Sequence, residues 1–326
     1  MKEFVIKRTI RLFTLLFAVS FLTFMLVYLS PIDPVRAYIG ADMLLISPEQ
    51  REAIQSYWGL NQSMFLQYKQ WLTNLLSGDF GTSLIYRTPV FDVISDRFFS
   101  SILLIAIAWV SSGIFGMVFG TLAAMNEGKW LDRFIKGYCY VLLSTPGFWL
   151  GLLLLMVFSV WLGIFPTGLS APIGITGSEV TFMDRLYHAI LPAMTLSVVG
   201  VSNVCLHTRQ KLVDVLRQPH ILQARANGLF GMRLFIRHGL RHVMIPAVSV
   251  HFASFGELFG GAILAEQVFS YPGLAQAVVD AGLQGDVPLF LAIVVMSAVF
   301  VFVGNWLADM LYYLLDPRLR RGEKPS

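Results

Sequence analysis

The sequence predicts an all-α polytopic membrane protein with six transmembrane helices and a helical external loop after the first. Three observations point to this fold class. Of the 326 residues, 56% are hydrophobic and only 13% are charged, whereas a soluble globular domain carries about 25% charged residues. Six apolar runs reach the length needed to cross roughly 30 Å of hydrocarbon. Basic residues gather in alternate connections between those runs.

The six apolar runs are each expected to form a helix, because backbone polar groups within lipid must find their partners in the same segment. A β-barrel is not expected, since its strands show short alternating patterns and these runs are continuous. The runs are Ile10–Leu29, Ser100–Met125, Phe134–Leu162, Ala189–Leu206, Met244–Leu264 and Leu289–Leu315.

The first run belongs to residues 1–29, which we interpret as a cytoplasmic N-terminus followed by helix 1. Its basic start and apolar continuation imitate a secretory signal peptide. The apolar part is about twenty residues long, however, which is enough to span the membrane. The small-residue pattern of a cleavage site does not follow it. We therefore expect an uncleaved transmembrane helix.

We expect residues 30–98 to form an external loop, because they are too polar to cross the membrane. It mixes charged side chains with aromatic ones, among them Tyr57, Trp58, Tyr68, Trp71 and Phe80. We expect it to fold as a small helical cap with its own apolar core. Residues 99–315 then form the core bundle with the remaining helices, and residues 316–326 form a cytoplasmic tail.

The distribution of basic residues predicts which side of the membrane each connection faces. Eighteen of the 24 lie before or at the start of the first run, between the second and third runs or at the start of the third, between the fourth and fifth, or after the sixth. These regions share one side if six helices alternate, and the positive-inside rule assigns that side to the cytoplasm. Both termini are therefore expected inside the cell. The net charge of +4 reports this topology and does not predict nucleic-acid binding.

Small residues and one proline predict how the helices pack. Pairs of glycines four residues apart allow two helices to approach closely, and a proline within a run kinks the helix. Cys139 and Cys205 lie inside apolar runs, so we interpret them as small buried hydrophobes and not as a disulfide or a zinc site. The glycine pairs are Gly116/Gly120, Gly147/Gly151 and Gly256/Gly260, and the proline is Pro146.

Residues 209–242 form the most basic connection, and their pattern predicts two short helices that meet at Gly228. Leu222, Ala226, Leu229 and Phe230 follow the spacing of one apolar helix face. That face is not expected to be buried within the loop alone. Either it docks on a partner protein, or the helix lies on the lipid headgroups with its basic side outward.

Several function classes find little support in the sequence. An enzyme is disfavoured because there is no glycine-rich phosphate loop, no His-Glu-x-x-His pair and no nucleophile elbow. A channel or secondary transporter needs charged groups deep in the bundle. Only Glu257 lies near the middle of a run, while His207 and Asp309 lie nearer the ends. These observations favour a membrane subunit that is driven by another protein.

The chain resembles the permease subunits of binding-protein-dependent ABC importers of the dipeptide, oligopeptide and nickel family. Residues 223–228, followed by Ile245-Pro246, resemble their cytoplasmic coupling motif Glu-Ala-Ala-x-x-x-Gly and Leu-Pro, with Gln223 in place of the Glu and Arg225 in place of the second Ala. The resemblance covers nearly the whole chain in order. Further matches are Gly78, Asp79 and Gly81 in the external loop, Pro272 and Gly273 in the stretch EQVFSYPGLAQ, and Asp316-Pro317-Arg318 at the C-terminus.

The resemblance implies a type I ABC importer permease with six transmembrane helices in the bacterial cytoplasmic (inner) membrane. Its partners would be a second homologous permease, two cytoplasmic ATPase subunits, an external substrate-binding protein and the membrane lipids. ATP and magnesium would be bound by the ATPase subunits, and this chain would hold no cofactor and no catalytic residue. The loop would dock on an ATPase through Leu222, Gln223, Ala224, Ala226, Gly228, Leu229 and Phe230.

The substrate is the least determined feature. A carboxylate such as Glu257 at mid-membrane costs roughly 2.5–3.5 kcal/mol unless it is paired or faces water, so it is either bonded to a neighbouring helix or lines the pathway. With His251 and His207, it favours nickel or a metal–chelator complex over peptides, the alternative substrate. His251 and Glu257 lie about 120° apart on a helix. We therefore assign no firm metal site and treat Glu257 as a transient contact.

Overall fold

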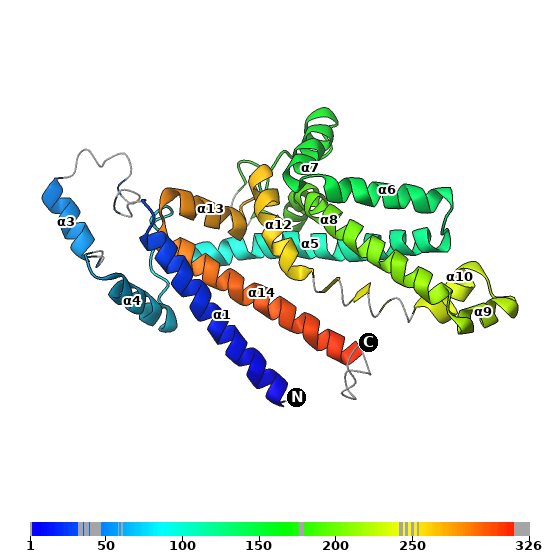
Figure 1. Ribbon diagram of the computed structural model, residues 1–326. Helices are drawn as coiled ribbons and strands as arrows, with labels where there is room; N and C mark the ends of the chain where they lie inside the picture. The colour runs from blue at the N-terminus through cyan, green and yellow to red at the C-terminus, as the bar shows by residue number, and fades with distance from the viewer. Residues whose placement is uncertain are drawn as a thin grey trace. The chain divides into compact units, whose positions relative to one another are not determined.

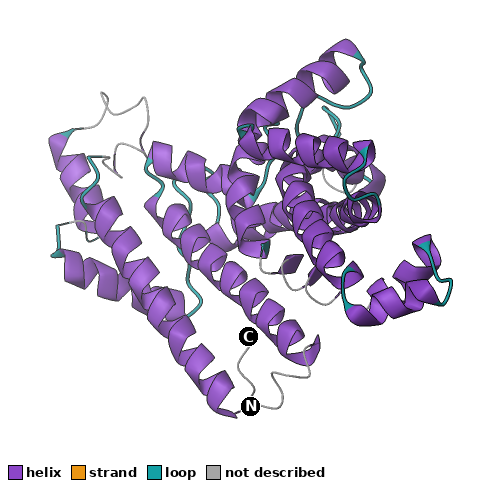
Figure 2. Cartoon of the chain, turned by 45° about the vertical axis from the view of Figure 1, so that its right-hand side comes forward, coloured by secondary structure: helices purple, strands orange, loops and turns teal. Residues whose placement is uncertain are grey.

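The computed structural model describes residues 2–31, 35, 39, 47–57, 59, 61–175, 179–240, 244, 247, 248, 251, 252 and 254–315. Throughout these residues the regular structure is helical (Figures 1 and 2), and the only β-pairing is one isolated bridge between Thr82 and Pro89. The predicted all-α fold class is confirmed. The chain divides into two compact units, Met1–Ser101 with Pro272–Phe302, and Ile102–Tyr271 with Val303–Ser326.

The first unit holds the external loop and the helices on which that loop packs. Tyr68 of α4 is buried against Phe24 of α1, and its hydroxyl lies 2.9 Å from the Ser20 hydroxyl. Tyr68 and Trp71 therefore pack on α1 and do not form the separate core that the sequence predicted, because helices this short have little apolar surface of their own. The helices are α1 (Lys2–Tyr28), α3 (Pro48–Tyr57), α4 (Met64–Leu76), the start of α5 (Val90–Met125), α13 (Leu274–Gln284) and the start of α14 (Val287–Leu315).

Asp286 joins the external loop to α14 within the first unit. Its carboxylate is fully buried and accepts hydrogen bonds from the backbone N–H of Leu289 at 3.2 Å, which caps α14. The same carboxylate accepts a hydrogen bond from the Ser83 hydroxyl and another, at 3.1 Å, from the backbone N–H of Ile85. A single buried acid thus fixes both the start of the last helix and the loop at residues 83–85.

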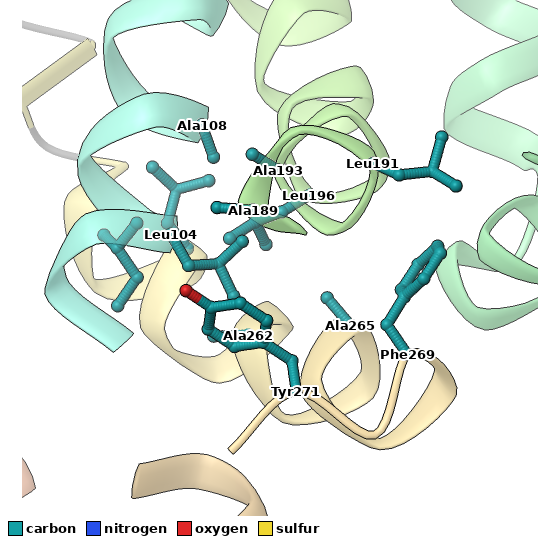
Figure 3. Close-up of a cluster of buried hydrophobic side chains, with 12 residues drawn as sticks. Leu104, Ala108, Ala189, Leu191, Ala193, Leu196, Ala262, Ala265, Phe269 and Tyr271 are labelled. Atoms are coloured by element: carbon teal, nitrogen blue, oxygen red, sulfur yellow. The ribbon is translucent and has the colours of Figure 1, made fainter. Parts of the chain in front are cut away.

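The second unit is built around α8 (Phe182–Leu216), which begins at a capping box formed by Thr181 and Asp184. Its core brings together Leu104 from α5, Ala189 and Leu196 from α8, and Ala262 from α12 (Figure 3). The other elements are α6 (Trp130–Ser144), α7 (Gly147–Leu154), the π-helix η2 (Leu155–Trp161), α9 (Pro219–Ala226), α10 (Gly231–Leu234), the π-helix η4 (Phe235–Gly239) and α12 (Phe255–Val268).

The first predicted glycine pair brings two helices into close contact. A Cβ atom at Gly116 would lie 2.6 Å from Val204 Cβ, and one at Gly120 would lie 2.6 Å from the Cys205 carbonyl oxygen. The backbones of α5 and α8 therefore touch, as the small-residue pattern predicted. The other pairs contribute less: Gly151 lies against Thr195, whereas no atom lies within 4 Å of the corresponding position at Gly147 or Gly260.

Among the residues that the structure describes, four helices are long and apolar enough to cross a membrane: Arg8–Tyr28, Val90–Met125, Phe182–Leu216 and Val287–Leu307. The third predicted helix is not continuous, because Trp130–Ser144 and Gly147–Trp161 meet at 107°. Pro146 lies at this break, which confirms the predicted kink, since the residue before a proline avoids the helical conformation. If these two helices are counted together as one bent span, the described residues contain five spans.

The fifth predicted run, Met244–Leu264, is only partly covered by the described residues, which include α12 with 14 residues. The count of six transmembrane helices therefore stays a prediction. Ile245-Pro246 and Asp316-Pro317-Arg318, two of the stretches that carry the resemblance, lie outside the described residues.

Candidate functional site

The basic loop consists of the two short helical pieces that the sequence predicted. The helix α8 continues to Leu216, further than the apolar run that ended at Leu206, so the first eight residues of the predicted loop are helical stem. Pro219 then starts α9. At Gly228 the backbone takes φ of 84°, a left-handed conformation, and α10 begins three residues later. The predicted meeting point at Gly228 is confirmed.

The inner side of the loop packs on its own stem. Ile221 and Ala224 of α9 are buried with Leu212 of α8 and with Leu234 and Phe235. These buried residues are not the predicted apolar face, of which only Leu229 packs against this cluster. The extended α8 instead buries a second side of the loop, which the sequence pattern did not single out. Ala224, predicted to contact a partner, lies instead in this internal cluster.

The outer side of the loop leaves large apolar side chains exposed. Leu222 is 52% exposed and Phe230 is 66% exposed, and Gln223, Ala226 and Gly228 are also exposed. Leu229 is half-buried against the internal cluster. Met232 and Ile236, which the sequence pattern did not single out, are exposed as well. The loop thus combines a packed interior with an apolar exterior.

A cavity of about 230 Å³ lies between α7, α8 and α12. Most of its walls are apolar or glycine, including Gly147, Leu196 and Gly261. Four polar side chains also reach its wall, from Thr195, Asn203, Ser254 and Glu257. The cavity is therefore a mainly apolar space with one carboxylate and three neutral hydrogen-bonding groups.

Glu257 lies in the first turn of α12 and its side chain is exposed. Within the described part of the chain, its carboxylate has no hydrogen-bonding or ionic partner. The sequence left open whether this residue is bonded to a neighbouring helix or lines a pathway. Its position on the cavity wall favours the second interpretation.

The two histidines that the sequence grouped with Glu257 lie apart from the cavity wall. The His251 ring stacks on Trp109, with ring centroids 4.5 Å apart, and is 6% exposed. A Cβ atom at Gly113 would lie 2.7 Å from its Nε2 atom, so His251 is packed tightly against α5. His207 is half-buried on α8. Among the described residues, no group of three or more His, Cys, Asp or Glu side chains could hold a metal ion.

The external motif residues form tight turns in the first unit. Gly78 and Gly81 take φ of 86° and 78°, and Asp79 accepts a hydrogen bond of 2.9 Å from the backbone N–H of Gly81. Gly273, which follows Pro272, is the N-cap of α13. Phe80 packs in the cluster that contains Leu274 from α13. The two external motifs therefore contribute to one core.

Sequence reasoning missed a buried ion pair near the stem of the loop. Arg209 was counted only as one of the basic residues, yet it binds Asp132, whose side chain is fully buried. The one available signal was an acidic residue among the basic side chains Lys129, Arg133 and Lys136.

Comparison with known proteins decides the family. Residues 116–321 match the family described as "Binding-protein-dependent transport system inner membrane component". Residues 1–105 match its N-terminal companion, described as "Binding-prot-dependent transport system membrane comp, N-term". The chain belongs to this family.

Two relatives align with almost the entire chain. The oligopeptide transport system permease protein AppB of Bacillus subtilis (strain 168) is 35% identical over 320 residues, which cover 98% of this chain and 99% of that protein. The glutathione transport system permease protein GsiC of Escherichia coli (strain K12) is 36% identical over 322 residues, with the same coverage.

This chain is therefore a permease subunit of a binding-protein-dependent ABC importer and a multi-pass protein of the inner membrane. Such a permease works with a substrate-binding protein and with ATPase subunits, and it is not itself an enzyme. The alternatives of a channel or a secondary transporter are set aside by this family membership.

Proposed function

We propose that this permease forms half of the pathway of an importer for short peptides or peptide-like solutes. The observation that carries the proposal is the cavity that Glu257, Asn203, Ser254 and Thr195 line. Its volume of about 230 Å³ lies below the roughly 300–1,000 Å³ of a complete ligand pocket. A second homologous permease would supply the other wall.

The peptide alternative has better support than the nickel reading that the sequence favoured. The two relatives described above are named for oligopeptide and glutathione transport. A transition-metal ion such as nickel prefers several imidazole or carboxylate ligands, and His251 is packed on Trp109 away from the cavity wall. Nothing in the described residues therefore favours nickel.

The chemistry of the cavity suits the amino end of a peptide. At neutral pH a peptide carries one ammonium group, which the Glu257 carboxylate would attract. Asn203 and Ser254 would bind the neighbouring amide groups, and the apolar wall would accept side chains of varied shape. A pathway with a single charge of this kind holds its solute weakly enough to release it, as transport requires.

The loop at residues 209–242 is proposed as the contact with the ATPase. Leu222 and Phe230 would enter a groove of that subunit, while Gly228 allows the turn between α9 and α10. Two ATPase subunits would bind ATP and magnesium and drive the cycle, and this chain would need no cofactor. Both termini and this loop would face the cytoplasm, and residues 30–98 would face the binding protein outside.

The test is peptide uptake by the complete importer, reconstituted in liposomes with its binding protein. We expect Glu257→Gln to lower the uptake rate of a radiolabelled dipeptide about tenfold, because the ammonium loses its counter-charge. Uptake of the N-acetylated dipeptide, which has no ammonium, should be slow in both proteins and unchanged by the substitution.

Glu179→Gln is the matched control, because Glu179 is an exposed carboxylate that does not line the cavity. Dipeptide uptake that is the same for Glu257→Gln and Glu179→Gln would refute the role of Glu257. A complex that imports Ni²⁺ but neither peptide would refute the proposed substrate class.

A further inference from the structure

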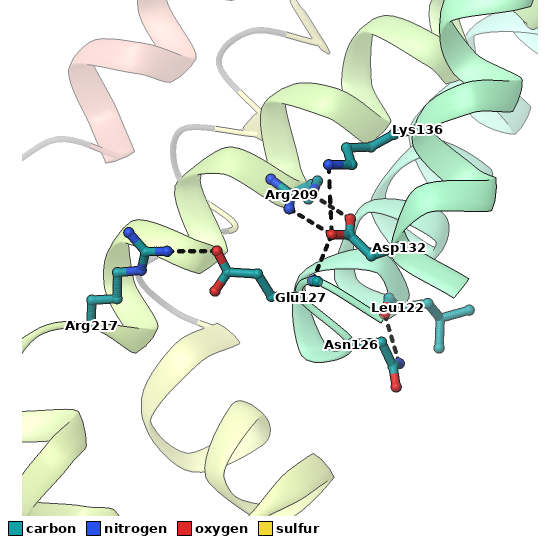
Figure 4. A network of polar contacts seen from close by, with 8 residues as sticks. Leu122, Asn126, Glu127, Asp132, Lys136, Arg209 and Arg217 are labelled. Atoms are coloured by element: carbon teal, nitrogen blue, oxygen red, sulfur yellow. Dashed lines mark hydrogen bonds and ion pairs between the residues drawn. The ribbon is translucent and has the colours of Figure 1, made fainter. Parts of the chain in front are cut away.

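The turn between α5 and α6 is joined to α8 through a buried carboxylate. Asp132, in the first turn of α6, accepts hydrogen bonds from Arg209 Nε at 2.6 Å and from Arg209 Nη2 at 2.8 Å (Figure 4). The Asp132 side chain is fully buried and that of Arg209 is only 12% exposed. Two parallel bonds between planar groups fix direction as well as distance.

The same carboxylate also closes the turn itself. The backbone N–H of Gly128 donates to Asp132 Oδ2 at 3.0 Å, and Lys136 Nζ lies 3.7 Å from that oxygen. Gly128 takes φ of 76°, which permits the tight reversal between α5 and α6. Arg209 therefore holds the whole turn through Asp132, and not only one side chain.

A second, weaker bridge lies further along α8. Arg217 donates to Glu127 at 2.7 Å, but the two side chains are 69% and 40% exposed, so water weakens this pair (Figure 4). Arg217 is the C-cap of α8 and lies two residues before Pro219, where α9 begins. The α5–α6 turn thus contacts the last two turns of the stem from which the loop extends.

The end of α5 also packs on the loop. Ala124 at the end of α5 lies in the apolar cluster that holds Ile221 and Ala224 of α9. Beyond α6, the chain breaks at Pro146 and continues into α7, whose first residue, Gly147, lines the cavity. A covalent path therefore runs from Asp132 along α6 to the cavity wall.

We propose that Asp132 and Arg209 are positioning residues that transmit the movement of the loop to α6 and, through it, to the α7 side of the cavity. The inference rests on the proposed docking of the loop on the ATPase. Because α8 also lines the cavity directly, loss of the pair should uncouple the α7 wall while the α8 wall still moves. This difference separates transmission from general stability.

The experiment places a cysteine reporter on each wall of the cavity in the complete importer. Gly147→Cys reports on α7, and no atom lies within 4 Å of its Cβ position, so the side chain is accommodated. Val199→Cys reports on α8. Maleimide labelling rates are compared with and without ATP and vanadate, which trap the closed ATPase. The buried native Cys139 and Cys205 give the background, measured in the chain without a reporter.

With the pair intact, both reporters should change their labelling rate on trapping. In Asp132→Asn and in Arg209→Lys, the change at Gly147→Cys should shrink at least fivefold, while the change at Val199→Cys and the stimulated ATP hydrolysis stay within twofold. The lysine variant keeps the charge and loses only the paired geometry. Glu127→Gln, in the exposed bridge of the same turn, is the matched control and should leave both reporters unchanged.

Three results would overturn the inference: a wild-type response at Gly147→Cys in both variants, a parallel loss at both reporters, or no ATP response at Gly147→Cys in the intact importer. Failure of both variants to assemble would also reject it, because the pair would then serve folding alone. Docking is tested separately with Phe230→Asp. If the ATPase still binds and is stimulated in that variant, the docking proposal fails, whatever the reporters show.

Discussion

At the residue scale, Gly228 shows how one backbone conformation sets the shape of the loop. Its φ of 84° lies in the left-handed region, which costs an L-residue roughly 1–2 kcal/mol. No atom lies within 4 Å of its Cβ position. Within this chain, any effect of a larger residue there must come from the backbone, since no neighbouring atom is in its way. The structure therefore indicates that glycine is needed here for the turn and not for lack of space, a distinction that the sequence motif alone could not make.

We therefore predict that Gly228→Val weakens ATPase binding while Gly228→Asn does not. A β-branched residue strongly resists this conformation, whereas asparagine accepts it. The penalty corresponds to about a tenfold loss of affinity. The measurement is titration of the purified ATPase subunit onto the permease pair in nanodiscs. Equal affinities for the two variants would show that the conformation of residue 228 does not matter for docking.

At the element scale, local patterns predicted the helices well and their ends poorly. The run Ala189–Leu206 is part of the longer helix Phe182–Leu216. Its C-terminal end was missed because the residues after Leu206 are charged, although they remain helical beyond the apolar region. Ala224 was assigned to a partner for the same reason, since the surface that buries it belongs to that unrecognised stem. Pro146 and Gly228 were predicted correctly, because proline and glycine act on the backbone where they stand.

Contacts between distant elements were beyond the reach of the sequence pattern. Asp132 and Arg209 are 77 residues apart, and no periodicity links them. The histidines were misgrouped with Glu257 because residue type alone does not show that the ring of His251 stacks on Trp109. The glycine pair at 116 and 120 is the exception, because small residues at this spacing directly allow two helices to approach closely.

The close contact between α5 and α8 can be tested by comparing an alanine substitution at Gly120 with one at a glycine that has open space around it. We predict that Gly120→Ala destabilises the protein by about 1–3 kcal/mol, because the new Cβ would lie 2.6 Å from the Cys205 carbonyl oxygen and the helices must separate. Gly137 lies on α6 with no atom within 4 Å. Gly137→Ala should therefore be neutral or stabilise the helix by up to about 1 kcal/mol.

Thermal unfolding of the two purified variants in the same detergent measures the difference. Gly120→Ala should lower Tm by several degrees relative to the wild type, and Gly137→Ala should not. A fall of the same size in both would mean that the close approach of α5 and α8 is not what Gly120 provides.

At the scale of the whole molecule, the orientation in the membrane rests on charge. The basic residues at the start of α1, around the turn between α5 and α6, and from the end of α8 through the following loop would share the cytoplasmic side by the positive-inside rule. The loop at residues 163–175 would then face outward. Family membership makes the chain a multi-pass protein of the inner membrane, but the direction of insertion remains a prediction with its own test.

We predict that a cysteine at Ile173 is labelled from outside intact cells and that a cysteine at Gln223 is labelled only after permeabilisation. Ile173 is 91% exposed and Gln223 is also exposed, so a membrane-impermeant maleimide can reach both side chains. Ser83, although in the same predicted external region, is unsuitable because its side chain is buried against Asp286. The native Cys139 and Cys205 are buried, so the unsubstituted protein should give little signal. Labelling of Gln223→Cys in intact cells, with Ile173→Cys protected, would reverse the topology and remove the loop from the reach of a cytoplasmic ATPase.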